Sequence, residues 1–148
     1  MSWSCRSGGG NFIAGCAIAV KARLPSARVV GVQSEAAPAV WQSWQRGEIV
    51  SADSHTFAGG IATTGPVAMA FAVMQQTVAG MYLVSEDELM GGIALIAKHH
   101  ALIVEGAAAA PLAAVQRYPA DFKGKRVVLV VSGRNLDMAT LARALARG

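Results

Sequence analysis

The stretch "SGGGNFIAGC", residues 7–16, places three consecutive glycines directly before an apolar run with helical spacing. A glycine turn frees backbone N–H groups, and the start of the following helix adds partial positive charge. Such a junction can bind a phosphate without a side-chain cation. The expected donors are the amides of Gly8, Gly9, Gly10 and Asn11. A tight turn that packs a helix on a sheet is the alternative interpretation.

Two common phosphate-binding motifs do not match this glycine run. Gly10 and Gly15 have the spacing of P-loop glycines, but the next two residues are Cys-Ala instead of Lys-Ser/Thr. The charge and the magnesium ligand of a P-loop are therefore absent. The dinucleotide fingerprint GxGxxG also fails, because Ile13 stands at the third glycine position counted from Gly8.

Strand-like and helix-like segments alternate along the chain. The expected strands are residues 1–5, 28–33, 81–85, 101–104 and 126–132, and the expected helices are residues 11–24, 37–47, 66–80, 85–100, 106–118 and 136–148. This alternation predicts a single α/β domain over residues 1–148, with a three-layer arrangement: a mostly parallel sheet and helices on both faces. The apolar run 126–132 is typical of a strand buried on both faces. Ser85 and Glu88 have the spacing of a helix capping box.

Composition excludes several classes of protein. Hydrophobic residues make up 53% of the chain and charged residues 15%, which argues against disorder. The net charge is only +4, and the loose cluster Lys123, Lys125, Arg126 and Arg134 is expected to be a solvated surface and not a nucleic-acid site. Two cysteines make neither a disulfide framework nor a zinc site.

A membrane span is not expected either. The segment of residues 56–85 contains no charged side chain, and it is long enough to cross a bilayer. The same segment holds a glycine pair, a threonine pair, a Gly-Pro step and two glutamines, so we expect a buried helix and a strand. Arg6 and the glycine run stand where a signal peptide would need apolar residues, and a cytoplasmic location is the prediction.

The glycine run also begins a longer similarity. The segment "SGGGNFIAGCAIAVKARLPSARVVGVQSEAAPA" resembles fold-type II pyridoxal-phosphate enzymes of the threonine/serine dehydratase (threonine ammonia-lyase) and serine racemase group. The resemblance continues through "FAGGIA", "LVSEDEL", "VEGAAAAPLAAV" and "VVLVVSGRNLD", and it covers nearly the whole chain. It implies the C-terminal part of the catalytic unit, mostly its larger domain.

The resemblance implies a site for pyridoxal 5'-phosphate. The family's tetraglycine loop binds the cofactor phosphate, which corresponds here to Gly8, Gly9, Gly10 and Asn11 with the Phe12 amide nearby. Asn11 stands at the usual fourth glycine, and asparagine tolerates a left-handed backbone. Ser132 corresponds to the partner of the pyridine nitrogen, and a neutral hydroxyl does not force that nitrogen to be protonated. Glu105 corresponds to a glutamate near the cofactor, or else is a charge at a helix N-terminus.

Several positions depart from the family pattern. Gln33 and Ala39 stand where some members bind a divalent cation through acidic residues, so no metal site is expected. Glu35 is expected to be exposed. His99 and His100 would point about 100° apart on a helix and cannot share a metal ion. The family usually has an aspartate where this chain has a glycine, just before the second glycine of "FAGGIA", which affects substrate positioning.

The family's Schiff-base lysine lies in an N-terminal region that has no counterpart in this sequence. Lys21, Lys98, Lys123 and Lys125 match none of its lysine contexts. The resemblance therefore implies part of an L-threonine/L-serine ammonia-lyase that is inactive alone and acts on an amino acid only with a complementing N-terminal half. A truncated, non-enzymatic binding or self-associating module and a serine racemase-like fragment are the alternatives.

The uncharged segment "PVAMAFAVMQQTVAGMYLV", residues 66–84, also predicts assembly. A helix of this composition is stable in water only when both of its faces are covered. We expect a homo-oligomer with Met69, Val73 and residues near Gln76 close to the contact. The polar pair Gln75-Gln76 would lie at the rim of this contact or form hydrogen bonds across it.

Overall fold

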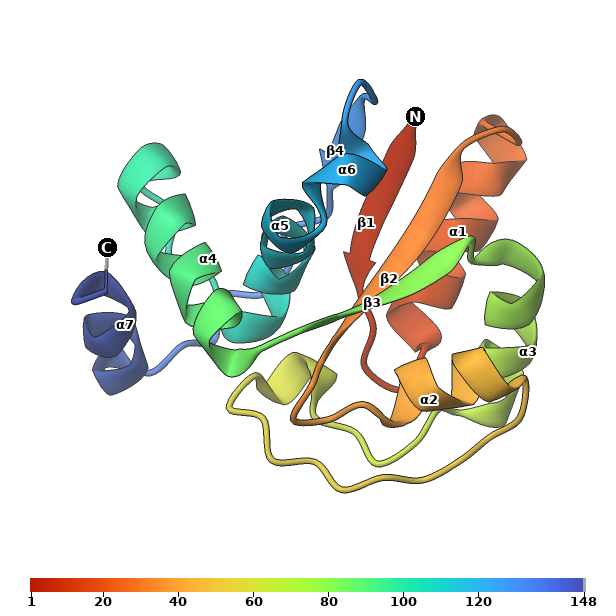
Figure 1. The fold of residues 1–148 in the computed structure, drawn as a ribbon, viewed down its shortest axis with the longest axis horizontal. Coiled ribbons are helices and arrows are strands. Elements are labelled where there is room, and N and C mark those ends of the chain that lie inside the picture. Colours follow the sequence, from red (N-terminus) through yellow and green to blue (C-terminus); the bar gives the residue numbers. More distant parts are fainter. Residues whose placement is uncertain (148) are drawn as a thin grey trace.

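The structure is a computed structural model that describes residues 1–147, and its centre is a parallel sheet (Figure 1). The strands are β1 (Ser2–Arg6), β2 (Arg28–Ser34), β3 (Gly80–Val84) and β4 (Val127–Leu129). Their order in the sheet is β3-β2-β1-β4, and each neighbouring pair is parallel. Because β1 lies inside the sheet between β2 and β4, the first and last strands of the chain are neighbours. The predicted α/β class is confirmed.

Helices connect and cover these strands. They are α1 (Asn11–Arg23), α2 (Ala39–Arg46), α3 (Ala68–Thr77), α4 (Glu86–His100), α5 (Gly106–Arg117), α6 (Pro119–Phe122) and α7 (Met138–Leu145), with a short 3-10 turn, η1 (Gly59–Ile61). The six predicted helices are present, with ends within a few residues of those expected. The predicted end of the last helix, residue 148, lies outside the described residues. The short α6 was not predicted.

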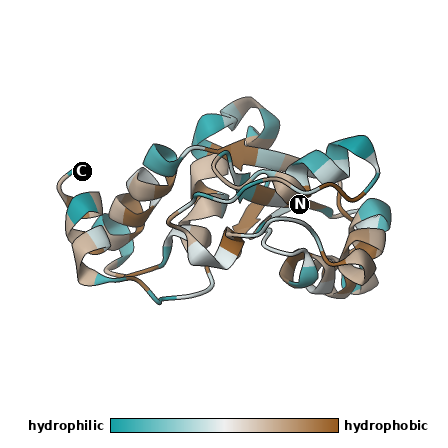
Figure 2. Ribbon diagram, turned by 90° about the horizontal axis from the view of Figure 1, so that it is seen from below, coloured by the Kyte–Doolittle hydropathy of each residue, from teal (hydrophilic) through white to brown (hydrophobic). Residues whose placement is uncertain are grey.

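The two faces of the sheet have separate apolar cores. On one face, Val29 of β2 and Met81 of β3 are buried with Ile13 of α1. On the other, Val32 and Val84 pack with the alanines of α5. Helix α4 packs on α5, and α7 packs on α4. Figure 2 shows the hydrophobic colouring concentrated in the strands between these layers, so the predicted covering of both faces is confirmed.

Short sequence signals determine where two of the helices begin. The Ser85 hydroxyl accepts from the Glu88 amide at 3.2 Å, while the Glu88 carboxylate accepts from the Ser85 amide at 2.7 Å. The predicted capping box is therefore confirmed. At the start of α1, the left-handed residue is Gly10, with φ 96°, and Asn11 is the first helical residue. The left-handed conformation considered for Asn11 was wrong because the glycine before it makes the turn.

Two strand predictions were wrong. Residues 101–104 do not form a strand, because Ala101 ends α4 in a left-handed conformation and Leu102 and Ile103 are more than 40% exposed. The run 126–132 contains only the three residues of β4, all half-buried, and not a strand covered on both faces. Within the described residues β4 pairs with β1 alone, so it forms an edge of the sheet. An apolar run does not distinguish an edge strand from a central one.

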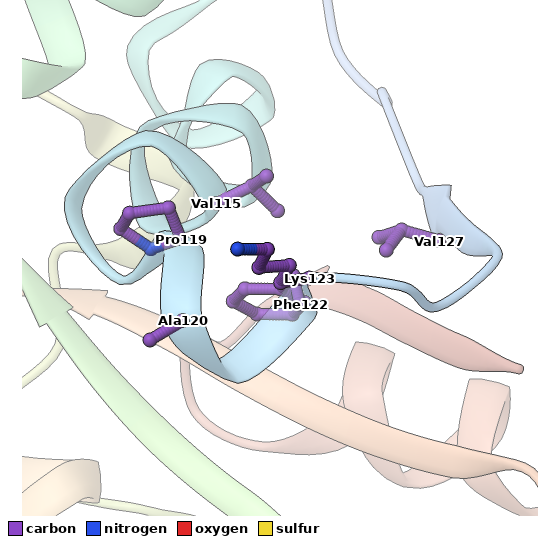
Figure 3. Close-up of a pocket in the computed structure, with 6 residues that line it drawn as sticks. All are labelled: Val115, Pro119, Ala120, Phe122, Lys123 and Val127. Atoms are coloured by element: carbon purple, nitrogen blue, oxygen red, sulfur yellow. The ribbon is translucent and has the colours of Figure 1, made fainter.

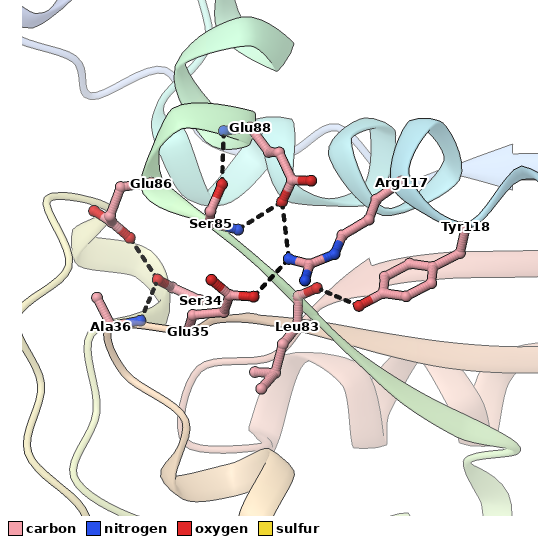
Figure 4. A network of polar contacts seen from close by, with 9 residues as sticks. All are labelled: Ser34, Glu35, Ala36, Leu83, Ser85, Glu86, Glu88, Arg117 and Tyr118. Atoms are coloured by element: carbon pink, nitrogen blue, oxygen red, sulfur yellow. Dashed lines mark hydrogen bonds and ion pairs between the residues drawn. The ribbon is translucent and has the colours of Figure 1, made fainter.

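A polar network joins the carboxyl ends of β2 and β3 to α4 and α5 (Figure 4). Arg117 Nη1 donates to Glu35 Oε1 at 2.6 Å and to Glu88 Oε2 at 3.0 Å. Hydrogen bonding to Glu35 is the main cause of a raised pKa for Arg117. The Glu35 side chain is 44% exposed, as predicted. Ser34 also donates to Glu86, so α4 is held at the strand ends at two points.

The uncharged segment 56–85 forms a loop, η1, α3 and β3. Within residues 1–147, no helix has both the length and the apolar character that crossing a membrane requires. Helix α3 buries Ala70, Phe71 and Met74 against the domain, while Met69 is 80% exposed.

Candidate functional site

The glycine loop, residues 7–12, joins the carboxyl end of β1 to the start of α1. Within the described part of the chain, the N–H groups of residues 8–12 donate to no protein acceptor. The Gly9 carbonyl accepts from the Val67 amide at 2.9 Å, which fixes the loop against the start of α3. Five free amides at the N-terminus of a 13-residue helix are the donors that an anion needs.

The shape of the loop depends on two of its glycines. A Cβ at Gly8 would lie 2.7 Å from the Gly60 carbonyl oxygen, and one at Gly10 would lie 2.9 Å from Met74 Sδ. A Cβ at Gly9 would meet only Val67, at an ordinary 3.6 Å. Asn11 is exposed and Phe12 is half-buried. The loop therefore packs closely on its own support and leaves its amides free, which fits the phosphate of pyridoxal phosphate.

The turn after β4 reaches the same end of the sheet. Because β4 is parallel to β1 and beside it, the segment that follows β4 lies next to the glycine loop. Ser132 Oγ accepts a hydrogen bond from Arg6 Nε at 3.0 Å across 126 positions of sequence. Gly133 has φ 92°, so the chain turns sharply just after Ser132. The structure thus brings Ser132 and the glycine loop together.

Glu105 is the third predicted residue at this end. It is the N-cap of α5, but its side chain makes no capping hydrogen bond. Its carboxylate lies against Gly133, and a Cβ at Gly60 would be only 2.8 Å from Glu105 Oε1. The Glu105 amide also donates to the Gly133 carbonyl at 3.2 Å. The residue therefore has the position of a helix-end charge, while its carboxylate packs beside the Ser132 turn.

Arg6 is the residue at this site that the sequence analysis missed. It is the last residue of β1, and its Nη1 donates to the Gly60 carbonyl at 2.9 Å. Its guanidinium lies 4.6 Å from the centroid of the Phe12 ring. In the described structure, Arg6 and Glu105 form no ion pair. One sequence signal could have indicated this residue: it is a charged residue at the end of the first expected strand, directly before the glycine loop.

The four lysines lie elsewhere. Lys21 is in the last turn of α1, and its ammonium donates to the Pro25 carbonyl. Lys98 is in the last turn of α4. Lys123 and Lys125 precede β4, at the opposite end of that strand from Ser132. None of them approaches the glycine loop through a hydrogen bond or an ion pair in the described residues.

The positions that carry acids in metal-binding relatives are structural here. Gln33 is fully buried, and its Oε1 accepts from the Trp41 amide at 2.9 Å. Ala39 is buried at the start of α2. His99 and His100 are in the last turn of α4. Over residues 1–147 there is no group of three or more His, Cys, Asp or Glu side chains arranged to hold a metal ion.

A separate hollow lies between α5, α6 and β4 (Figure 3). It has a volume of about 600 Å³ and is lined by Val115, Pro119, Ala120, Phe122, Lys123 and Val127. Figure 3 shows the Lys123 side chain pointing into it. The hollow is at the amino end of β4 and Ser132 follows the carboxyl end, so it is not part of the candidate site.

A parallel α/β sheet with a glycine loop of free amides and a serine turn at adjacent strand ends is typical of a cofactor-binding domain. The family model described as "Pyridoxal-phosphate dependent enzyme" matches residues 3–133, and the chain belongs to this family. Members of the family depend on pyridoxal phosphate, and the residues of this site suit its phosphate.

Individual relatives agree with this assignment. The L-threonine ammonia-lyase of Geobacter sulfurreducens is 39% identical over 143 residues, which are 95% of this chain and 35% of that protein. The solved threonine deaminase of T.th. superposes with a TM-score of 0.87 at 34% identity, covering 93% of this chain and 50% of that one. Serine racemase from Dictyostelium discoideum superposes with a TM-score of 0.84 at 27% identity, covering 93% of this chain and 44% of that one. The chain thus spans about a third of the length of the lyase.

Proposed function

We propose that this chain binds the phosphate and the ring nitrogen of pyridoxal phosphate in an enzyme that deaminates L-threonine or L-serine. The observation that supports it is the position of five free amides, at residues 8–12, beside the Ser132 hydroxyl at one end of the sheet. The amides would hold the phosphate. Ser132 would donate to the ring nitrogen, and Glu105 would border the ring through its contact with the Ser132 turn.

The reaction would remove the α-proton of the amino acid and expel the β-hydroxyl as water. Water would then hydrolyse the released unsaturated amine to a 2-oxo acid and ammonia. When bound, the cofactor supplies the electron sink that stabilises negative charge at the α-carbon. The family uses a lysine for covalent attachment, and the lysines of this chain lie away from the glycine loop. We therefore propose that catalysis requires a partner segment that supplies the lysine and the substrate contacts. Racemisation of serine is the variant of this chemistry that the racemase similarity favours.

The test is anion binding by the purified chain. Inorganic phosphate and an analogue of the cofactor with a methyl group in place of its aldehyde are titrated by calorimetry. The analogue cannot bond covalently to a lysine, so its affinity reports the site alone. Gly9→Asp places an anion in the loop where a Cβ has room, and it should weaken both ligands at least tenfold by charge repulsion.

Gly15→Asp is the matched control. A Cβ at Gly15 meets nothing within 4 Å, and the residue is exposed on α1 one turn beyond the loop. Both variants add one negative charge to the same part of the chain. Equal affinities in Gly9→Asp, Gly15→Asp and the unmodified chain would show that the loop is only a turn.

A non-enzymatic, self-associating module is the second candidate. The specific observation is the exposed apolar surface of α3 and its start, where Val67 is 49% and Met69 is 80% exposed and no residue is charged. Large exposed apolar side chains on one uncharged helix favour association. A homo-oligomer and a cytoplasmic location stay predictions.

A further inference from the structure

Arg6 has a role that the glycine loop and the serine turn do not explain. It is half-buried, and it ends β1 in the middle of the sheet, where its charge must be satisfied by neighbours. Its guanidinium donates to Ser132 Oγ and to the Gly60 carbonyl, and it stacks near the Phe12 ring. One side chain thus contacts the serine turn, η1 and the residue whose amide closes the glycine loop.

The bond to Ser132 determines how that hydroxyl can act. A serine hydroxyl has one proton to donate and two lone pairs that accept. Because Arg6 Nε is a donor only, it occupies a lone pair and leaves the Ser132 proton free for a second partner. A hydroxyl that accepts from a cation is also a stronger donor, because hydrogen bonds in a chain polarise one another.

The positive charge has a second effect. A positive charge close to a titrating base disfavours the protonated, cationic form of that base and so lowers its pKa. Arg6 lies one hydrogen bond, 3.0 Å, from the serine oxygen that would face the ring nitrogen. The other charged group beside this turn is Glu105, whose carboxylate packs on Gly133 and would act in the opposite direction. Arg6 contacts the serine oxygen itself, whereas Glu105 packs on the backbone that follows it.

We infer that Arg6 is a positioning residue that orients the Ser132 hydroxyl as a donor toward the ring nitrogen and keeps that nitrogen unprotonated. This inference rests on the proposed function, because it concerns the same site. It extends the binding site to a residue outside the loop, and it explains why a charged side chain ends a strand next to a phosphate-binding turn.

The test follows the protonation of the methyl analogue bound to the full chain. The ultraviolet absorbance of its ring differs between the protonated and neutral nitrogen, so a pH titration gives the ring pKa without any turnover. Arg6→Gln removes the charge and should raise the proton affinity of the bound ring about tenfold. The far-ultraviolet circular dichroism spectrum and the thermal melting of this variant show whether it is folded.

Arg6→Lys is the conservative variant. It keeps the charge but loses the Nε donor, so the ring should keep its low proton affinity while the analogue binds at least threefold more weakly than to the unmodified chain. If Arg6→Gln does not fold, the Arg6→Lys variant still tests the inference. Equal ring titration in the unmodified chain and Arg6→Gln, or unchanged analogue affinity in Arg6→Lys, would overturn the inference.

Two outcomes separate this inference from the proposed function. If the unmodified chain binds phosphate but not the analogue, Arg6 excludes the ring, and the inference fails while the phosphate site stands. If the chain binds neither ligand, the proposed function fails and the inference fails with it.

Discussion

The carboxylate of Glu105 occupies the space that a side chain at position 133 would need. Gly133 is also left-handed, with φ 92°, so two independent features require glycine there. The turn after Ser132 and the start of α5 are consequently fitted to each other, and a change at either residue alters the position of the Ser132 hydroxyl.

Replacement of Gly133 by alanine should therefore lower the free energy of unfolding by roughly 2–3 kcal/mol. About 1–2 kcal/mol of this loss comes from the left-handed backbone and the rest from displacement of the carboxylate. Gly124→Ala is the matched control, because Gly124 has φ 71° but its Cβ would meet nothing within 4 Å. Urea denaturation of both variants measures the difference, and equal losses would contradict the role of Glu105.

The purified chain should form no 2-oxobutanoate from L-threonine, even when pyridoxal phosphate is present. The reason is that its four lysines lie away from the glycine loop, so none is placed to bond the cofactor. The keto acid is measured by its reduction with NADH in a coupled assay. Product that disappears when Lys21, Lys98, Lys123 or Lys125 is replaced by arginine would contradict this prediction.

The chain should associate through the exposed side of α3. Met69→Glu places a charge on the most exposed apolar side chain of this helix and should convert the oligomer to a monomer of 15.3 kDa, measured by light scattering at micromolar concentration. Ile18→Glu is the control, since Ile18 is 55% exposed but lies on α1. A monomer before any substitution, or equal effects of the two variants, would exclude α3 as the contact.

The two cysteines should differ in reactivity. Cys5 is fully buried, and burial, with a smaller contribution from Cys16, raises the pKa of its thiol from 9.0 to about 12. At about pH 8.5 iodoacetamide should modify Cys16, which is half-buried, and leave Cys5 unmodified until the chain unfolds. Mass spectrometry of the labelled peptides checks this, with Cys16→Ser as the control. Early modification of Cys5 would show that the core at β1 opens readily.

The same shift sets a pH limit on stability. The folded state holds the Cys5 proton more tightly than the unfolded state, so this contribution is complete below about pH 9 and is lost as the pH rises toward 12. The melting temperature should therefore decline between about pH 9 and about pH 12, and the decline should be smaller in Cys5→Ala.

Signals contained within a few residues predicted the local structure well. The Ser85 and Glu88 spacing indicated the start of α4, and the alternation of strands and helices indicated the parallel sheet. The error at residues 101–104 has a physical cause, since a short apolar run becomes a strand only if a neighbour pairs with it. For the same reason, the run 126–132 could not show that β4 is an edge strand.

The site was predicted as far as sequence blocks could indicate it. The loop at residues 8–12 and Ser132 were both expected, and they lie at one end of the sheet. The contact of Arg6 with Ser132 and Gly60 could not be foreseen, because it depends on β1 and β4 being neighbours and on where η1 packs. Side-chain contacts across 126 positions require the fold itself.

The pairing of β1 with β4 has a consequence for the order in which the molecule forms. Residues 2–4 align with residues 127–129, so the sheet is completed only when nearly the whole chain closes into one loop. Closing so long a loop has a large entropic cost that early local contacts do not offset. During synthesis, β1, β2 and α1 can assemble long before the segment with Ser132 emerges. The glycine loop also needs η1 and α3 as its support, and both precede Ser132 in the chain. The complete site can therefore form only after the segment that carries Ser132 has joined β1.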